Sequence, residues 1–276
     1  MMASVMDDRE NAWVDLGLSH RLWYTPDDPY DTGSLSFELC ARGDGVIARN
    51  VVCGPLAGTE LRAFDLNVWE QQQGTHPEDQ VTSEEVESAG WEAILASQKR
   101  SVTERWECAV MRVGAECVRS SVAPRGVLSG IADVLSLRDF PDRLVDFEWE
   151  DFNRAFEVRT TDRRFINDIL DARMLALLYG RAQDCVVEFV GNRAMVARPL
   201  SDPTDVAGLA TLGADLIAAV PPVVRELYPA LLGVPLTPRC PMKADGTVQM
   251  PEVVEPYHPY AADNLDPGGW APRRPS

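Results

Sequence analysis

The fold class is decided by residues 151–200, which read DFNRAFEVRTTDRRFINDILDARMLALLYGRAQDCVVEFVGNRAMVARPL. Apolar and polar side chains alternate over residues 156–160, which is the period of a half-buried strand. Apolar residues then recur at helical spacing over residues 163–179. Thr161 or Asp162 is suited to cap the start of this helix. This stretch therefore predicts a strand followed directly by a helix.

A hairpin is expected after this helix, which Gly180 is suited to stop. Residues 185–190 and 194–197 are two short runs rich in apolar side chains. The sequence Gly-Asn-Arg at 191–193 lies between them and has the chemistry of a tight turn. The order strand, helix, strand, strand indicates a sheet with helices packed on it.

A further helix is predicted over residues 206–224, the one stretch that resembles a membrane span. Asp202 suits the N-cap, Pro203 the first helical position, and Asp205 the positive helix end. Asp215 lies near the centre of the stretch, where an acidic side chain costs about 2.5 to 3.5 kcal/mol on insertion. We therefore expect a buried amphipathic helix and no integral membrane segment.

Short strands are expected in the first half, because short apolar runs alternate there with segments rich in Gly and Asp. They cover residues 35–39, 47–53, 61–69, 106–113, 118–123 and 144–149, with a turn at 114–116 and a short helix at 127–135. Short connections favour antiparallel pairs, since parallel strands need long crossovers. The predicted class is α+β, with an antiparallel or mixed sheet and helices mainly from the second half.

The predicted organisation is one α+β domain over residues 23–232, preceded by an N-terminal segment, 1–22. Residues 70–105 are polar and acidic and form an expected insertion between two strands. Thr82 and Glu85 fit a capping box, which predicts a short surface helix inside this insertion.

The C-terminal residues, 233–276, are expected to form a disordered tail. Nine of the 20 prolines of the chain lie between Pro235 and Pro275. Proline lacks a backbone N–H and fixes its φ angle, so such a segment forms neither regular helix nor central strand. We expect an extended, proline-rich and flexible tail.

The charge balance excludes partners that are recognised by clustered basic residues. The chain has 43 acidic and 26 basic residues, a formal net charge of -17. Nucleic acids and anionic lipid headgroups bind basic surfaces, because both carry phosphate charge. Nucleic acid is therefore not an expected partner.

The six cysteines are scattered, without a CxxC pair or a histidine at zinc-ligand spacing. We see no signal peptide ahead of them, and a domain of this size does not need disulfides. Reduced and mostly buried thiols are expected, which favours a cytoplasmic protein.

No pattern of known catalytic chemistry occurs in the sequence. His20, His76 and His258 lie in separate segments, so none is expected beside a nucleophile or a metal. A phosphate-binding loop, a dinucleotide fingerprint and a nucleophile elbow are also missing from the sequence. We assign no catalytic residue, cofactor or metal on these patterns.

Several motifs together resemble an uncharacterised group of actinobacterial proteins, related to a bacterial domain of unknown function (domain of unknown function 3137). The motifs are RGD at 42–44, ARNVVCG at 48–54, AFD at 63–65, DFNRAFEV at 151–158 and ARM at 172–174. The resemblance runs from about Trp23 to Tyr228. It implies no known activity, substrate or catalytic residue.

Three functions stay open. The leading hypothesis is a cytoplasmic, non-enzymatic protein-binding or regulatory domain that binds a protein or peptide partner through the acidic insertion or the tail. The second is an enzyme with a carboxylate and arginine site, because the resemblance concentrates on polar residues: Asp65, Asp151, Arg154 and Arg173. That hypothesis requires these side chains to converge in one pocket. The third is a peripheral membrane-associated protein, which the negative charge disfavours.

Overall fold

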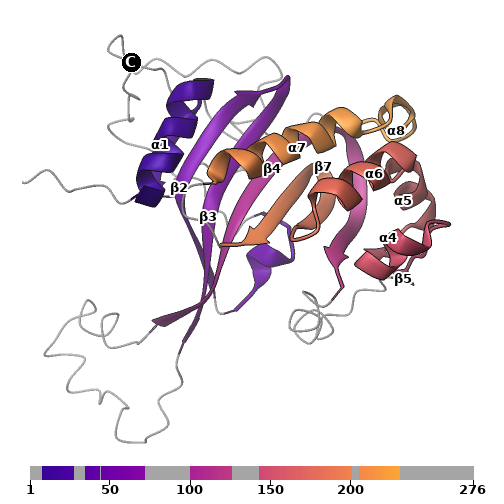
Figure 1. The fold of residues 1–276 in the computed structure, drawn as a ribbon, viewed down its shortest axis with the longest axis horizontal. Coiled ribbons are helices and arrows are strands. Elements are labelled where there is room, and N and C mark those ends of the chain that lie inside the picture. The colour runs from indigo at the N-terminus through magenta and orange to yellow at the C-terminus, as the bar shows by residue number, and fades with distance from the viewer. Residues whose placement is uncertain are drawn as a thin grey trace, which may run out of the picture.

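An antiparallel sheet with helices packed on it forms the described part of the chain (Figure 1). The computed structural model describes residues 8–27, 35–43, 45–71, 100–125, 143–200 and 205–230. In these ranges the sheet has seven strands, and all of the pairs between them are antiparallel. The predicted α+β class with an antiparallel sheet is therefore confirmed.

The elements follow one another in an order that brings most helices after residue 149. The strands are β1 (Trp23–Asp27), β2 (Gly45–Leu56), β3 (Thr59–Gln71), β4 (Arg100–Pro124), β5 (Arg143–Leu144), β6 (Phe156–Thr160) and β7 (Val186–Pro199). The helices are α1 (Asp8–His20), the 3-10 helix η2 (Leu39–Ala41), α4 (Glu150–Ala155), α5 (Arg163–Ile169), α6 (Ala172–Arg181), α7 (Val206–Ala219) and α8 (Pro222–Leu227).

The long strand β4 organises the sheet, because it is paired along both of its edges. On one edge it pairs first with β3 and then, near its C-terminal end, with β6. On the other edge β7 runs beside it, from the pair Trp106 and Pro199 to the pair Val122 and Val187. The strand order is β1-β2-β3-β4-β6-β5, with β7 beside β4.

Alternation along the strands divides the buried side chains between two cores. The core on the helix face includes Trp13, Leu61, Ala109, Met111, Phe165 and Leu216. The core on the opposite face includes Phe37, Leu39, Phe64, Val110 and Met195. Glu188 of β7 points into this second core and accepts hydrogen bonds from the backbone N–H groups of Glu38 (2.7 Å) and Leu39 (3.2 Å). This buried carboxyl thereby holds η2 against the sheet.

Helix α1 belongs to the packed structure, although the sequence analysis treats residues 1–22 as a segment ahead of the domain. Trp13 is fully buried, and Leu16 belongs to the same core as strand residue Leu61. The helix contacts β1 and β2. A boundary at residue 23 therefore separates α1 from the sheet on which it packs.

The prediction of a buried helix over residues 206–224 is confirmed, with a break that divides it into α7 and α8. Asp215 lies on the outside of α7, where it forms an exposed ion pair with Arg181 of α6. Asp205 is the N-cap, and its side chain accepts a hydrogen bond from the N–H of Gly208; the cap was expected at Asp202. Among the described helices, none has the length and apolar character needed to cross a membrane.

The two turns predicted at 114–116 and 191–193 are wrong, because β4 and β7 each continue through them. Gly114 and Gly191 do have positive φ angles, +77° and +58°, but they use them in irregularities of the ladder. Two successive register pairs are Arg112 with Arg193 and Cys117 with Gly191. Between these pairs β4 uses more residues than β7. These glycines therefore produce bulges, which bend a strand pair without ending it.

Other element boundaries also differ from prediction. Residues 35–39 contain no strand and lead into η2, while the strand expected at 144–149 shrinks to β5. The helix expected over 163–179 is two helices, because Asp171 caps a new start at Ala172. Asp162 is the N-cap of the first of them, and the second continues one residue past Gly180.

Several predictions concern residues outside the described ranges. They are the helix at 127–135, the capping box of Thr82 and Glu85, and the proline-rich tail. Of the predicted acidic insertion, residues 70–71 belong to β3 and residues 100–105 to β4, and the residues between them are not described.

Candidate functional site

A row of charged side chains crosses the helix face of the sheet. Asp65 of β3 and Glu107 of β4 are register partners, and Glu107 in turn is the register partner of Arg198 in β7. All three alternate with apolar residues of the helix-side core, so they point toward the helices. Asp65 and Glu107 are 6% and 1% exposed, which places their carboxylates under the helices and away from bulk water.

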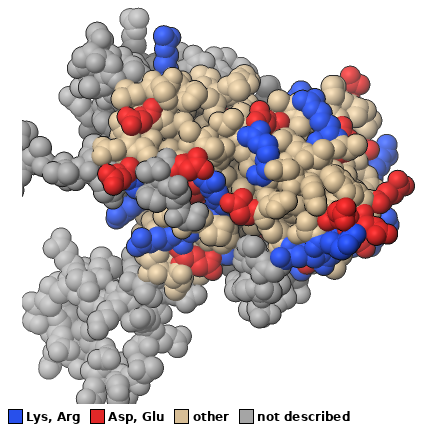
Figure 2. Space-filling model, in the orientation of Figure 1, with Lys and Arg blue, Asp and Glu red and all other residues tan. Residues whose placement is uncertain are grey.

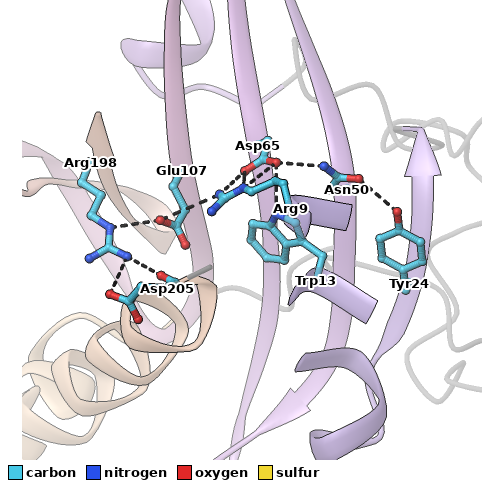
Figure 3. Close-up of polar contacts among 8 residues, drawn as sticks. All are labelled: Arg9, Trp13, Tyr24, Asn50, Asp65, Glu107, Arg198 and Asp205. Carbon is cyan, nitrogen blue, oxygen red and sulfur yellow. Dashed lines mark hydrogen bonds and ion pairs between the residues drawn. The ribbon is translucent and has the colours of Figure 1, made fainter. Parts of the chain in front are cut away.

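Asp65 is bound on several sides (Figure 3). Arg9 of α1 donates from Nε to both carboxylate oxygens at 3.1 Å, and its second nitrogen also pairs with Oδ1. Trp13 donates from Nε1 to Oδ2 at 3.0 Å, and Asn50 donates from Nδ2 to the same oxygen at 2.9 Å. The carboxylate is therefore paired with a cation and accepts hydrogen bonds from three residues.

The position of Asn50 depends on an irregularity in β2. The register of β2 and β3 shifts between Arg49 and Val52, and Asn50 has a φ angle of +52°. Asn adopts this left-handed region more readily than most residues. The side chain is thereby turned toward Asp65, and its Oδ1 accepts a hydrogen bond from the hydroxyl of Tyr24 at 3.0 Å.

Glu107 has one bound oxygen and one oxygen without a partner among the described residues. Its Oε2 accepts from Nε of Arg198 at 3.0 Å and lies 3.9 Å from a guanidinium nitrogen of Arg9. Its Oε1 is buried and makes no hydrogen bond there. Burial raises the pKa of Glu107 to about 7, because the loss of water outweighs the opposing effect of Arg198 and Arg9. This carboxyl is a proton-binding group near neutral pH.

Arg198 connects the row to the start of α7. Its Nε is bound to Glu107, while its terminal nitrogen donates to the Asp205 side chain at 3.0 Å and also to the Asp205 backbone oxygen. Asp205 is itself the N-cap of α7. Together with Arg9 in α1, this pairing ties two helices to three strands. The row therefore has a clear role in fixing α1 and α7 on the sheet.

The predicted polar cluster does not assemble. Asp65 is in the buried row, whereas Asp151 and Arg154 form an exposed ion pair of 2.8 Å on α4. Arg173 is exposed on α6. Figure 1 shows α4 and α6 at the end of the sheet away from α1, which supplies the partner of Asp65. The structure thus brings Asp151 and Arg154 together, and it leaves Asp65 with other partners.

The residues that actually surround Asp65 were missed by the sequence analysis. A usable signal exists for Glu107, which interrupts an apolar strand at a position in phase with Ala109 and Met111. An acidic residue on a core-facing position needs a buried cation or buried hydrogen-bond donors. The sequence does not indicate which arginine supplies the cation, because Arg9 and Arg198 come from opposite ends of the chain.

No group of three His, Cys, Asp or Glu side chains suited to a metal ion occurs in the ranges that the structure describes. Five cysteines are buried, reduced thiols, as predicted: Cys40, Cys53, Cys108, Cys117 and Cys185. Cys240 lies outside the described ranges. Burial raises the pKa of the Cys117 thiol to about 12, so this thiol stays protonated and unreactive at neutral pH.

A second candidate site lies where the sheet extends beyond α1 and α7 (Figure 1). Ile47 and Val102 are 44% and 49% exposed, and the half-buried Trp69 lies between them in the register. The ring of Trp69 lies against Gly45, where an added Cβ would be 2.5 Å from a ring carbon. We call these three side chains, together with the exposed Arg49 and Arg105, the strand-end surface.

The members of the strand-end surface share one face of the sheet. Ile47 and Arg105 are both aligned with Asn67, and Val102 is aligned with Trp69. Neither Arg49 nor Arg105 forms a side-chain ion pair with another described residue. The view in Figure 2 shows acidic and basic side chains interspersed over the described surface. The strand-end surface thus combines exposed apolar side chains with two arginines that form no ion pair within the described ranges.

Comparison with known proteins identifies a structural neighbour. No family model matches the chain, and no curated protein matches it. The crystal structure of the mycobacterial trehalose monomycolate transport factor A, TtfA, matches with a TM-score of 0.50 and 15% sequence identity. The match covers 79% of this chain and 98% of the TtfA chain. At this identity the likeness shows a similar fold.

Proposed function

We propose that this chain is a non-enzymatic protein-binding module and that the strand-end surface is its docking site. The observation that carries the proposal is the exposure of Ile47 and Val102 beside Trp69. Exposed apolar side chains next to an aromatic ring and arginines have the composition of protein interfaces. The surface also adjoins Gln71 and Arg100, the register partners that bound the undescribed part of the acidic insertion.

The buried charged row supports a structural use of Asp65. A substrate that reached this carboxylate would have to displace Arg9, Trp13 or Asn50, and it would have to separate α1 from the sheet. Breaking a buried ion pair costs several kcal/mol, on the order of 3 to 5. The reduced, buried cysteines suit a reducing compartment, so we place the proposed function in the cytoplasm.

The proposal is tested by affinity purification of the tagged full chain from its native cells. The variant Ile47→Ser with Val102→Ser removes the apolar side chains without changing the net charge. The matched control is Val223→Ser with Leu227→Ser, because these α8 side chains are 47% and 48% exposed at another site. We expect a stoichiometric partner whose yield falls about tenfold in the first variant, the effect of about 1.4 kcal/mol of lost binding.

The control variant should retain the partner at the wild-type yield. Circular dichroism and thermal unfolding of both variants establish that each is folded. A partner that is retained equally by the two variants, or lost equally from both, contradicts docking at the strand-end surface.

A further inference from the structure

We infer that the strand-end surface recognises an acidic segment of its partner in which carboxylates are interspersed with apolar side chains. This inference rests on the proposed function and adds the chemistry of the partner. It follows from the placement of Arg49 and Arg105 relative to Ile47.

The geometry places a cation on two sides of an apolar side chain. Arg49 is two residues along β2 from Ile47, so their attachment points on this face are about 7 Å apart. Arg105 lies two strands away from Ile47 through Asn67, which corresponds to about 10 Å. The spacing of about 7 Å matches that between alternate side chains of an extended peptide, and the spacing of about 10 Å is close to two turns of a helix.

Seven described arginines form ion pairs with described acidic residues, and the two arginines of the strand-end surface are not among them. Arg42 beside this surface points to the opposite face, where it is buried, pairs with Glu104 at 2.7 Å and lies over Trp106. Arg112, Arg159 and Arg181 likewise have acidic partners. Arg49 and Arg105 are exposed and form no ion pair within the described ranges. A carboxylate supplied by a partner would complement both of these arginines.

The acidic character of the whole chain narrows the class of partner. A net charge of -17 repels long anionic polymers and anionic membranes. Two arginines contact only a few of their many phosphates, and the remaining phosphates face an acidic protein. A short acidic segment has few carboxylates, and these can lie beside Arg49 and Arg105. Its apolar side chains cover Ile47, Trp69 and Val102, which gives binding energy that phosphates cannot supply. We therefore favour a protein segment over a membrane or nucleic acid.

A charge-swap experiment tests this inference on the full chain. The probe is a short fluorescent peptide in which glutamate alternates with leucine and tryptophan, and its counterpart has lysine in place of glutamate. The protein variant is Arg49→Glu with Arg105→Glu. The matched control is Arg163→Glu with Arg173→Glu, which makes the same change in net charge at exposed positions of α5 and α6.

We expect the wild type to bind the glutamate peptide at least about tenfold more tightly than the lysine peptide. The variant Arg49→Glu with Arg105→Glu should reverse this preference, and the control variant should keep it. A preference that is unchanged by both variants overturns the inference. If the cellular partner is lost with Ile47→Ser and Val102→Ser but not with the arginine variant, the proposed function holds and the acidic chemistry is wrong.

Two further measurements test other occupants of the surface. Replacing residues 72–99 by a short turn should leave the affinity for the glutamate peptide within about twofold of the wild type. An increase of about tenfold would show that the chain's own segment occupies the surface, and would overturn an external partner. Sedimentation with phosphatidylserine vesicles that depends on Arg49 and Arg105 would overturn the choice of a protein.

Discussion

Asp65 and Glu107 are register partners on neighbouring strands, and Arg9 lies within ion-pair distance of both carboxyl groups. Two acidic groups side by side in a core are unfavourable unless cations accompany them. The two carboxyl groups are stabilised in the core in different ways. Asp65 takes the close pairing with Arg9, while Glu107 depends on Arg198 and has a raised pKa.

Removing the charge of Asp65 should strongly destabilise the fold. In Asp65→Asn, Arg9 stays buried without its nearest counter-charge, so the free energy of unfolding should fall by about 3 kcal/mol. Urea unfolding followed by circular dichroism measures the loss. Asp151→Asn is the matched control, because its ion pair with Arg154 is exposed and should contribute less than about 1 kcal/mol. Equal losses in the two variants would refute the role given to the buried row.

The left-handed conformation of Asn50 gives a second prediction. Asn50→Ala removes the hydrogen bonds to Asp65 and Tyr24 and puts alanine, which adopts the left-handed region less readily than asparagine, at a φ angle of +52°, so it should cost about 2 to 3 kcal/mol. Asn50→Gly loses the same hydrogen bonds but adopts this φ freely, and should be about 1 kcal/mol more stable than the alanine variant. Tyr24→Phe removes only one hydroxyl and should cost about 1 kcal/mol. An alanine variant as stable as the glycine variant would show that the backbone irregularity does not matter.

The sequence predicts elements well where a local signal decides them. The bounds predicted for strand β6 are the observed ones. Alternation over five residues defines the strand, and the helix cap at Asp162 defines where it has to end. The α+β class follows from the same stretch. The turns at Gly114 and Gly191 failed for a physical reason. A glycine with positive φ serves a hairpin turn and a bulge equally, and the pairing of distant strands decides between them.

The candidate site was predictable only in part. Only a family resemblance points to Asp65, and its partner Arg9 lies in the segment predicted to precede the domain. Arg198 and Glu107 meet only because β7 runs beside β4. The sequence predicts two short strands in place of each of these long strands, and it does not predict their pairing. The strand-end surface has no local signal at all. It exists because the sheet extends past its helices, and helix packing is a property of the whole fold.

Two glycines in neighbouring helices should respond to alanine in opposite directions. A Cβ at Gly213 of α7 would lie 2.1 Å from Sδ of Met111, which is fully buried in β4, so Gly213→Ala should cost about 1 to 3 kcal/mol. A Cβ at Gly180 of α6 meets nothing within 4 Å. Gly180→Ala should therefore stabilise the protein by about 0.5 kcal/mol through helix propensity. Thermal unfolding of both variants measures the signs, and a destabilised Gly180→Ala variant would contradict the packing described for α6.

The stability of the protein should fall as the pH rises toward neutrality. Burial raises the pKa of both Glu107 and Glu188 from the ordinary value of 4.5 to about 7. For each carboxyl the folded state binds a proton more tightly than the unfolded state, so the stabilisation is complete below about pH 4.5 and is lost as the pH rises through about 7. Each shift corresponds to about 3 kcal/mol.

Urea unfolding at a series of pH values between about 5 and 7 measures this dependence. We expect Glu107→Gln and Glu188→Gln each to reduce the decrease in unfolding free energy by about half, and the double variant to remove most of it. Glu150→Gln is the control, because its side chain is 89% exposed and should leave the slope unchanged. If the unfolding free energy of the double variant depends on pH as that of the wild type does, neither carboxyl titrates near neutrality. Glu107 in the charged row and Glu188 at the η2 contact would then be ionised over this whole pH range. A slope reduced by Glu188→Gln alone would instead place the neutral-pH titration at the η2 contact and leave Glu107 ionised beside Arg198.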